Sequence, residues 1–148
     1  MKLSKLTDYS VVLLSFLAQS NKPAQSAATL AEATGIPGPT VAKLMKMLAR
    51  NGLVTSTRGT AGGYALAQSA DETSVADIIT AIEGPIALTA CVDESEDLCA
   101  VESMCGVAGN WDSVNRAVRK ALDQVSLTDM APDWRAMFPE EPSEATPG

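Results

Sequence analysis

Apolar side chains in the first fifty residues recur every three or four positions, with breaks rich in Gly, Pro and Asn. This spacing is typical of amphipathic helices and predicts three of them, at residues 5–18, 27–34 and 39–50. Ser26 stands where an N-cap is expected, and Gly35 stands where a chain leaves a helix in a left-handed turn. The second and third helices are short and are joined by a Gly-containing turn, and the third has a polar and basic outer face. This is the pattern of a helix-turn-helix.

An alternating pattern replaces the helical one after the third helix. Residues 53–57 are rich in β-branched side chains, residues 58–63 form a Gly-rich turn, and residues 64–66 resume the alternation. These features predict a β-hairpin, the wing of a winged helix-turn-helix. A fourth helix is expected between its N-cap, Ser74, and Gly84.

The second half of the chain starts with residues 85–107, which lack periodicity and are rich in acids; we expect an exposed loop and call it the cysteine segment. Beyond it, a narrow apolar stripe lies along a helix expected at residues 108–130. The stripe consists of Trp111, Val114, Val118, Leu122 and Val125. We expect it to pair with its counterpart in a two-fold dimer; packing on its own domain is the alternative. Residues 131–148 are dominated by Pro, Glu, Ser and Thr, which predicts a disordered tail.

The predicted fold is therefore mainly α with a small β-hairpin. Residues 1–84 would form a winged helix-turn-helix region that binds DNA, followed by the cysteine segment, the dimerisation helix and the tail. The chain has 148 residues, of which 46% are hydrophobic, and it can bury a core. Because the first apolar run is too short to span a bilayer and no signal-peptide pattern follows, we expect a soluble, cytoplasmic protein without a membrane partner.

A net charge of -7 would argue against a nucleic-acid partner, because DNA binding depends on neutralising phosphates. The charges are unevenly distributed, however. Residues 1–70 contain seven Lys and Arg against two Asp and Glu, whereas residues 71–148 contain four against sixteen, so the two parts carry +5 and -12. The basic part is predicted to meet DNA, with a solvated helix face as the alternative. The candidate DNA-contacting residues of the third helix are Thr40, Lys43, Lys46 and Arg50.

Three cysteines, Cys91, Cys99 and Cys105, fall within fifteen residues with the spacing C-x7-C-x5-C. An odd number without a secretion signal is a poor disulfide framework and indicates a metal or redox site. Thiolates are the soft ligands that iron–sulfur clusters require. A structural zinc is the rival, although these spacings are longer than those of usual zinc knuckles. Incidental thiols are the third alternative, but free cysteine prefers apolar surroundings.

Several motifs resemble the Rrf2 family of winged-helix transcription regulators, which includes the IscR, NsrR and SUF-operon repressors. The motifs are LSKLTDY at residues 3–9, LARNGLV at 48–54, RGTAGGY at 58–64 and the three-cysteine segment. The resemblance covers roughly residues 1–130, and the combination is more specific than any single part. The stretches EGPIALT and GNW around the cysteines are similar to the branch that regulates SUF iron–sulfur assembly. The resemblance implies a homodimeric repressor of those genes that binds a pseudo-palindromic operator in double-stranded DNA.

The resemblance also implies a fourth iron ligand. In the IscR branch a histidine supplies it, but this chain contains no histidine. In the NsrR branch an aspartate of the partner's first helix supplies it, and Asp8 stands at the matching place. The implied site is a 4Fe–4S cluster on the three cysteines and Asp8 from the partner subunit, with a 2Fe–2S cluster as the alternative. Glu94, Glu96 or Glu102, or a hydroxide or small thiol, are alternatives to Asp8 as the fourth ligand. Without a metal, Asp8 would interact only with the macrodipole of its helix.

At the wing, Arg58 resembles the family's minor-groove arginine, since a narrow groove concentrates the negative potential that attracts a guanidinium. Gly59 beside it allows close approach of the backbone. A nitric-oxide-sensing or redox-sensing repressor of the same family is the nearest alternative function, and a zinc-stabilised adaptor is a further one. We expect no enzyme, because the sequence shows no nucleophile–base pair, phosphate loop or nucleotide fingerprint.

Overall fold

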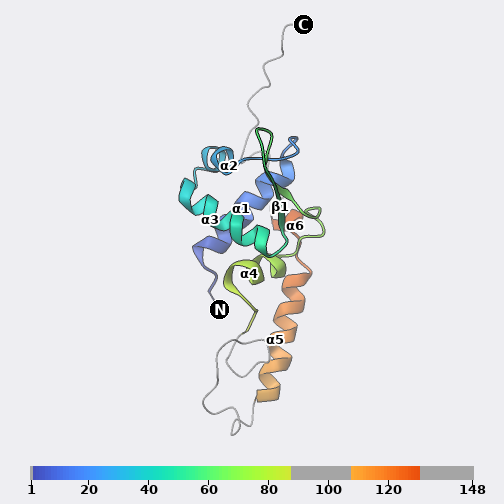
Figure 1. Ribbon diagram of the computed structural model, residues 1–148. Helices are drawn as coiled ribbons and strands as arrows, with labels where there is room; N and C mark the ends of the chain where they lie inside the picture. The colour runs from blue at the N-terminus through green and yellow to red at the C-terminus, as the bar shows by residue number, and fades with distance from the viewer. Residues whose placement is uncertain (1, 88–107, 131–148) are drawn as a thin grey trace.

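The computed structural model describes residues 2–87 and 108–130 and has the mainly helical architecture with one hairpin expected from the sequence (Figure 1). The elements are α1 (Lys5–Gln19), α2 (Ala27–Thr34), α3 (Gly38–Arg50), β1 (Val54–Thr57), β2 (Gly63–Leu66), α4 (Val75–Glu83), α5 (Ala108–Asp123) and α6 (Leu127–Met130). The predicted helices of the N-terminal half and the predicted hairpin are confirmed with bounds close to those expected. Within the described ranges, every helix is too short or too polar to cross a membrane.

The helices begin where side chains cap the free backbone N–H groups of the first turn. At α2, the Ser26 hydroxyl accepts a hydrogen bond from the backbone N–H of Thr29 at 3.1 Å. At α4, the Ser74 hydroxyl accepts from the N–H of Asp77 at 3.1 Å, and the Asp77 carboxylate accepts from the N–H of Ser74 at 3.2 Å. This pair is a complete capping box. Gly35 ends α2 in the left-handed conformation, as the sequence predicts.

The apolar faces of the N-terminal helices meet in one core. Its fully buried side chains include Leu13, Leu14, Leu30, Val41, Leu44, Met45, Leu48 and Ile78. Burial of each of the larger ones stabilises the fold by about 1.5–3 kcal/mol. α6 adds Leu127 to the same core, so the last described residues return to the N-terminal helices. The helix-turn-helix is therefore held on a packed base.

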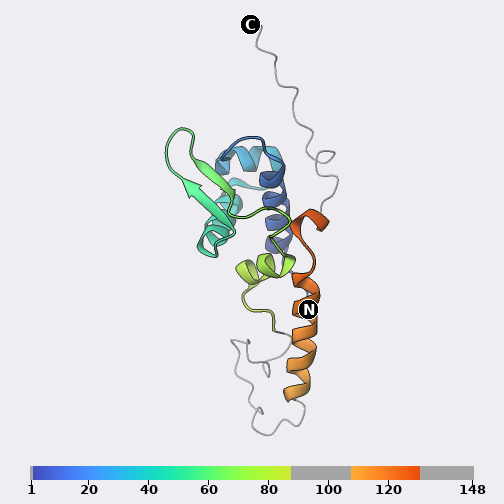
Figure 2. The same cartoon turned by 90° about the vertical axis from the view of Figure 1, so that its right-hand side faces the viewer.

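β1 and β2 pair in antiparallel register, with Val54 opposite Leu66. Residues 58–62 form the tip of the hairpin, which projects from the helical body (Figure 2). The segment before α2 extends the pairing: the N–H of Gln25 donates to the Tyr64 carbonyl at 2.9 Å, and the N–H of Tyr64 donates to the Gln25 carbonyl at 2.7 Å. The wing is therefore anchored to the start of the helix-turn-helix.

The single helix predicted at residues 108–130 is wrong, because the chain forms two helices there, α5 and α6. Between them, the carbonyl of Val125 accepts a hydrogen bond from the N–H of Val75 at 2.8 Å. Ser126 then caps α6 in a capping box with Asp129, whose carboxylate accepts from the N–H of Ser126 at 2.9 Å. Pairing with a distant segment and a new N-cap stop the helix, although Val125 keeps the helical spacing.

A second, smaller core lies between α4 and the end of α5. It contains Val75, Ala76, Ile79 and Ile86, and Leu122 and Val125 pack against it. The start of α5 extends away from the helical body in both views (Figures 1 and 2). The expectations for most of the cysteine segment and for the tail, residues 88–107 and 131–148, lie outside the described residues.

Candidate functional site

α3 carries the four DNA-contacting candidates on one side. Lys43, Lys46 and Arg50 are exposed, and Thr40 is half-buried near the helix start. Their spacings of three and four residues keep them on neighbouring turns of one strip. The opposite face of α3 is buried in the core, with Leu44 fully inaccessible. The structure therefore brings the sequence-predicted candidates together on the outer face of the second helix of the helix-turn-helix.

The positive charges of this strip are not paired with described acidic side chains. Within residues 2–87 and 108–130, no hydrogen bond or ion pair uses the charged groups of Lys43, Lys46 or Arg50. α3 also starts at Pro37 and Gly38 without a side-chain cap. Because the first-turn N–H groups of such a helix and its positive dipole end attract anions, the start of α3 and its cations can contact phosphates together.

The wing presents Arg58 at its tip. Arg58 is exposed directly after β1, and the neighbouring Gly59 has a φ of +109°. The hairpin follows α3 closely in the chain, and the N–H of Leu53 donates to the carbonyl of Leu48 in the last turn of α3 at 3.0 Å. The wing is thus attached directly to the end of α3, the second helix of the helix-turn-helix.

Asp8 lies in the first turn of α1, beside an apolar groove of about 390 Å³. The groove is lined from α1, α4 and the end of α6, by Leu3, Val11, Ile79 and Met130 among others. The Asp8 side chain is exposed, and no other residue of the described ranges forms a hydrogen bond or ion pair with its carboxylate. No described residue of α5 lines the groove.

The apolar stripe of the C-terminal half has two different surroundings. Leu122 and Val125 pack against the chain's own α4, and Val118 is half-buried. Trp111 and Val114, near the start of α5, remain 40% and 44% exposed. Part of the stripe is therefore used within the chain, and part of it is an apolar surface that the described residues leave exposed.

Cys91, Cys99 and Cys105 lie outside the described residues, so the structure does not describe the three predicted metal ligands. Within the described ranges, no group of three or more metal-ligating side chains occurs. The structure does describe residues 85–87, at the start of the cysteine segment, and the helix that follows the segment. Ile86 is buried in the second core, and α5 begins at Ala108, three residues after Cys105.

Two functional candidates were missed by sequence reasoning. Asn115 of α5 is 3% exposed, and its Nδ2 donates to the carbonyl of Ile86 at 2.8 Å. Asn115 lies four residues after Trp111, one helical turn along the same face. A polar residue on that apolar face was the sequence signal that Asn115 is buried. Glu83 accepts a hydrogen bond from the N–H of Ser4 at 2.6 Å. No local pattern could indicate that bond, because the two residues are 79 positions apart.

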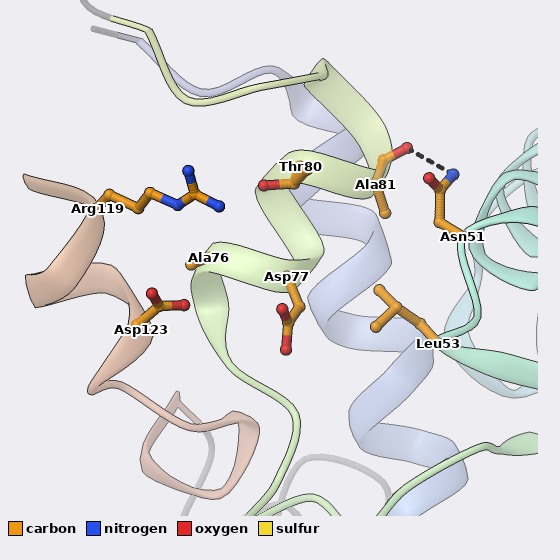
Figure 3. Close-up of a pocket in the computed structure, with 8 residues that line it drawn as sticks. All are labelled: Asn51, Leu53, Ala76, Asp77, Thr80, Ala81, Arg119 and Asp123. Carbon is orange, nitrogen blue, oxygen red and sulfur yellow. Dashed lines mark hydrogen bonds between the residues drawn. The ribbon is translucent and has the colours of Figure 1, made fainter. Parts of the chain in front are cut away.

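A polar pocket of about 170 Å³ lies between the end of α3, α4 and α5 (Figure 3). Asp77 and Thr80 line it from α4, and Arg119 lines it from α5. On the side opposite Arg119, Nδ2 of Asn51 donates to the carbonyl of Ala81 at 3.4 Å. The pocket thus lies where α4, α5 and the end of α3 come together.

Comparison with known proteins agrees with these features. The model of the Rrf2 family, described as an iron-dependent transcriptional regulator, matches residues 3–133. An HTH-type transcriptional regulator of Synechocystis sp. is 34% identical over 137 residues, which are 92% of this chain and 91% of that protein.

Solved structures show the same fold. CymR, the global cysteine regulator of B. subtilis, superimposes with a TM-score of 0.64 at 26% identity, over 89% of this chain and 97% of CymR. IscR of T. potens superimposes with a TM-score of 0.62 at 29% identity, over 96% of this chain and 94% of IscR. These proteins are transcription regulators and not enzymes. This chain therefore belongs to the Rrf2 family of winged-helix, DNA-binding transcription regulators.

Proposed function

We propose that this regulator is an iron–sulfur-cluster-dependent repressor of the SUF assembly genes, acting in the cytoplasm as a homodimer on a pseudo-palindromic operator. One observation carries the proposal. A single chain joins the exposed cations of α3 and the wing arginine, Arg58, to three cysteines that follow the buried Ile86 in the sequence. A DNA-reading surface and a soft-metal donor set on one chain are what a cluster-controlled regulator requires.

The donor set fits an iron–sulfur cluster with one oxygen ligand. Cys91, Cys99 and Cys105 provide three thiolates, and because the chain contains no histidine, we propose a carboxylate as the fourth donor. Asp8 is suited to this role because its carboxylate is exposed and binds no other described residue. When bound, a 4Fe–4S cluster would supply a centre that oxygen, nitric oxide or iron scarcity can dismantle.

The apolar surfaces support the homodimer and a ligand from the partner. Trp111 and Val114 form an exposed apolar surface at the start of α5, and the groove beside Asp8 is uncovered by the described part of the chain. In a two-fold dimer, the surface of each subunit can enter the groove of the other. Because Cys105 is six residues before Trp111, this docking would bring that cysteine towards the partner's Asp8.

Anaerobic gel shifts with DNA from upstream of the SUF genes and of the regulator's own gene test the proposed function. Cluster-loaded wild type, apo wild type and Asp8→Ala are compared, with Glu72→Ala as an exposed carboxylate control. We expect iron and labile sulfide in the wild type, and operator Kd values that differ by about 5-fold or more between the two wild-type forms. Asp8→Ala should lose iron faster in air, whereas Glu72→Ala should behave like the wild type.

Two outcomes would contradict the proposal. Identical Kd values for all forms would leave a DNA-binding regulator that no cluster controls. Colourless protein containing zinc in place of iron would favour the zinc-stabilised alternative.

The dimer is tested by sedimentation of Trp111→Ser, with Arg116→Ser as a control on the exposed face of the same helix. Removal of the indole should shift the protein towards monomer, because aromatic anchors dominate such interfaces. The arginine replacement should leave the dimer unchanged. An unchanged dimer of Trp111→Ser would place the interface elsewhere.

A further inference from the structure

Residues 81–86 run from the end of α4 into the first two residues of the cysteine segment, and they form hydrogen bonds with three other elements. We call residues 81–86 the coupling segment. We propose that the coupling segment transmits the state of the cysteine segment to the recognition helix α3, with Asn51, Glu83 and Asn115 as positioning residues. This inference rests on the proposed function, because it needs a cluster-dependent state to transmit. The three bonds are Asn115 Nδ2 to Ile86 O at 2.8 Å, Asn51 Nδ2 to Ala81 O at 3.4 Å and Ser4 N to Glu83 Oε1 at 2.6 Å.

On the sensing side, Asn115 attaches the base of the cysteine segment to α5. Asn115 and Ile86 are both buried, and Ile86 also packs against Ile79 of α4. The first predicted metal ligand, Cys91, follows Ile86 by five residues, so at most about 18 Å of extended chain separates the two. Among the described residues, the Asn115–Ile86 bond is the side-chain contact through which we propose that a change at Cys91 reaches α4 and α5.

On the DNA side, Asn51 attaches the recognition helix to the same segment. Asn51 is the C-cap residue of α3, and its Nδ2 also donates to the carbonyl of Met47 in the last turn at 2.8 Å. The neighbouring Arg50 is one of the candidate phosphate contacts. The bond from Asn51 to the carbonyl of Ala81 is visible in Figure 3. Because Ala81 is buried in the main core, displacement of Ala81 changes the support of the helix end that carries Arg50.

The third bond attaches α1, which carries Asp8. A capping box needs a side chain at the fourth position that accepts from the N–H of the N-cap residue. α1 has Ser4 as the N-cap but Thr7 at that position, and Glu83 supplies the acceptor from α4. Glu83 therefore completes the cap of the turn that holds Asp8. In the proposed dimer, this bond ties the ligand donated to the partner subunit to the base of the chain's own cysteine segment.

α4 packs in both cores and lies between these contacts. It is nine residues long and contributes Ile78 to the main core and Ile79 to the second core. Because packed interiors transmit displacement, a shift of α4 on the α5 side is felt on the α3 side. The polar pocket between Thr80 and Arg119 leaves space for α5 to change its position relative to α4.

Operator binding by cluster-loaded and apo protein tests the coupling. The measured quantity is the ratio of the two Kd values, for which we expect a factor of about 5–150 in the wild type. Glu83→Ala removes an exposed acceptor and should leave apo-form affinity within about twofold of wild type, and the cluster-loaded samples of all variants are compared at equal iron content. The ratio of the cluster-loaded and apo Kd values should nevertheless fall at least fivefold, with a ratio of one as the lower limit. Glu83→Gln keeps an acceptor oxygen and should restore the ratio, and Thr80→Ala is the matched control on the same helix.

Hydrogen exchange of the apo protein gives a readout that needs no cluster. Asn115→Leu should accelerate exchange of the amides of Asn51 and Leu53, which follow α3 and donate to its last turn, whereas Thr80→Ala should not. The coupling alone would be overturned if the wild-type ratio exceeds five but the Glu83→Ala variant keeps this ratio and the Asn115→Leu variant keeps the wild-type exchange rates. A wild-type ratio of one would overturn the proposed function, and the coupling with it.

Discussion

Replacement of Gly63 by alanine tests how the wing is held against the helical body. Gly63 has a φ of +147°, and a Cβ there would lie 2.4 Å from the carbonyl carbon and oxygen of Gln25 and 2.7 Å from the nitrogen of Ser26. All three are backbone atoms, which cannot turn aside as a flexible side chain can. The strand must therefore separate from Gln25, and the paired hydrogen bonds between Gln25 and Tyr64, at 2.9 and 2.7 Å, would be lost.

The cost follows from these two effects. A non-glycine residue in this conformation costs about 1–3 kcal/mol, and each lost backbone hydrogen bond costs about 0.5–1.5 kcal/mol. Gly63→Ala should therefore lower the free energy of unfolding by about 2–6 kcal/mol. Gly59→Ala is the matched control, because Gly59 has a φ of +109° but no atom within 4 Å of its added Cβ. It should cost about 1–3 kcal/mol, from conformational strain alone.

Urea denaturation of the reduced apo protein, followed by circular dichroism, measures both values. We expect the unfolding free energy of Gly63→Ala to lie about 1–3 kcal/mol below that of Gly59→Ala, the amount of the two hydrogen bonds. Equal stability of the two variants would refute the reasoning, since it would mean that the contact with Gln25 does not hold the wing.

Three further predictions concern the DNA-reading surface and the helix caps. Arg58→Ala should weaken operator binding and reduce the slope of log K against log salt by about 1, whereas Lys120→Ala on α5 should not; an unchanged slope would remove the wing arginine from the interface. Ser74→Ala should lower the unfolding free energy by about 0.5–2 kcal/mol in urea titrations, and no loss would show that the cap of α4 contributes nothing. The Ser126 backbone N–H lowers the pKa of Asp129, so the stabilisation is complete above the ordinary carboxyl pKa and is lost as pH falls through the lowered one. Asp129→Asn should therefore be less stable than wild type near neutral pH and equal to it in strong acid; a difference independent of pH would contradict this.

Much of the fold could be predicted from the sequence because its signals are local. Apolar spacing and the caps Ser26 and Ser74 indicated where helices begin, and Gly35 indicated where α2 ends. The exposed strip of α3 also follows from spacing alone. When one face of a helix is buried, the residues between the apolar positions lie on the opposite, exposed face. The wing was predicted by its Gly-rich turn, but the contact of Gly63 with Gln25 was not.

The sequence by itself determined the elements, the basic and acidic halves, and the residues with metal-binding chemistry. Tertiary structure alone decided where the last helix breaks, that Asn115 is buried on Ile86, and that Glu83 caps α1. The physical reason is the range of the interactions: a cap or an apolar period acts within one or two turns. The bonds that join α1, α3 and α5 to the end of α4 exist only after residues far apart in the chain have packed together.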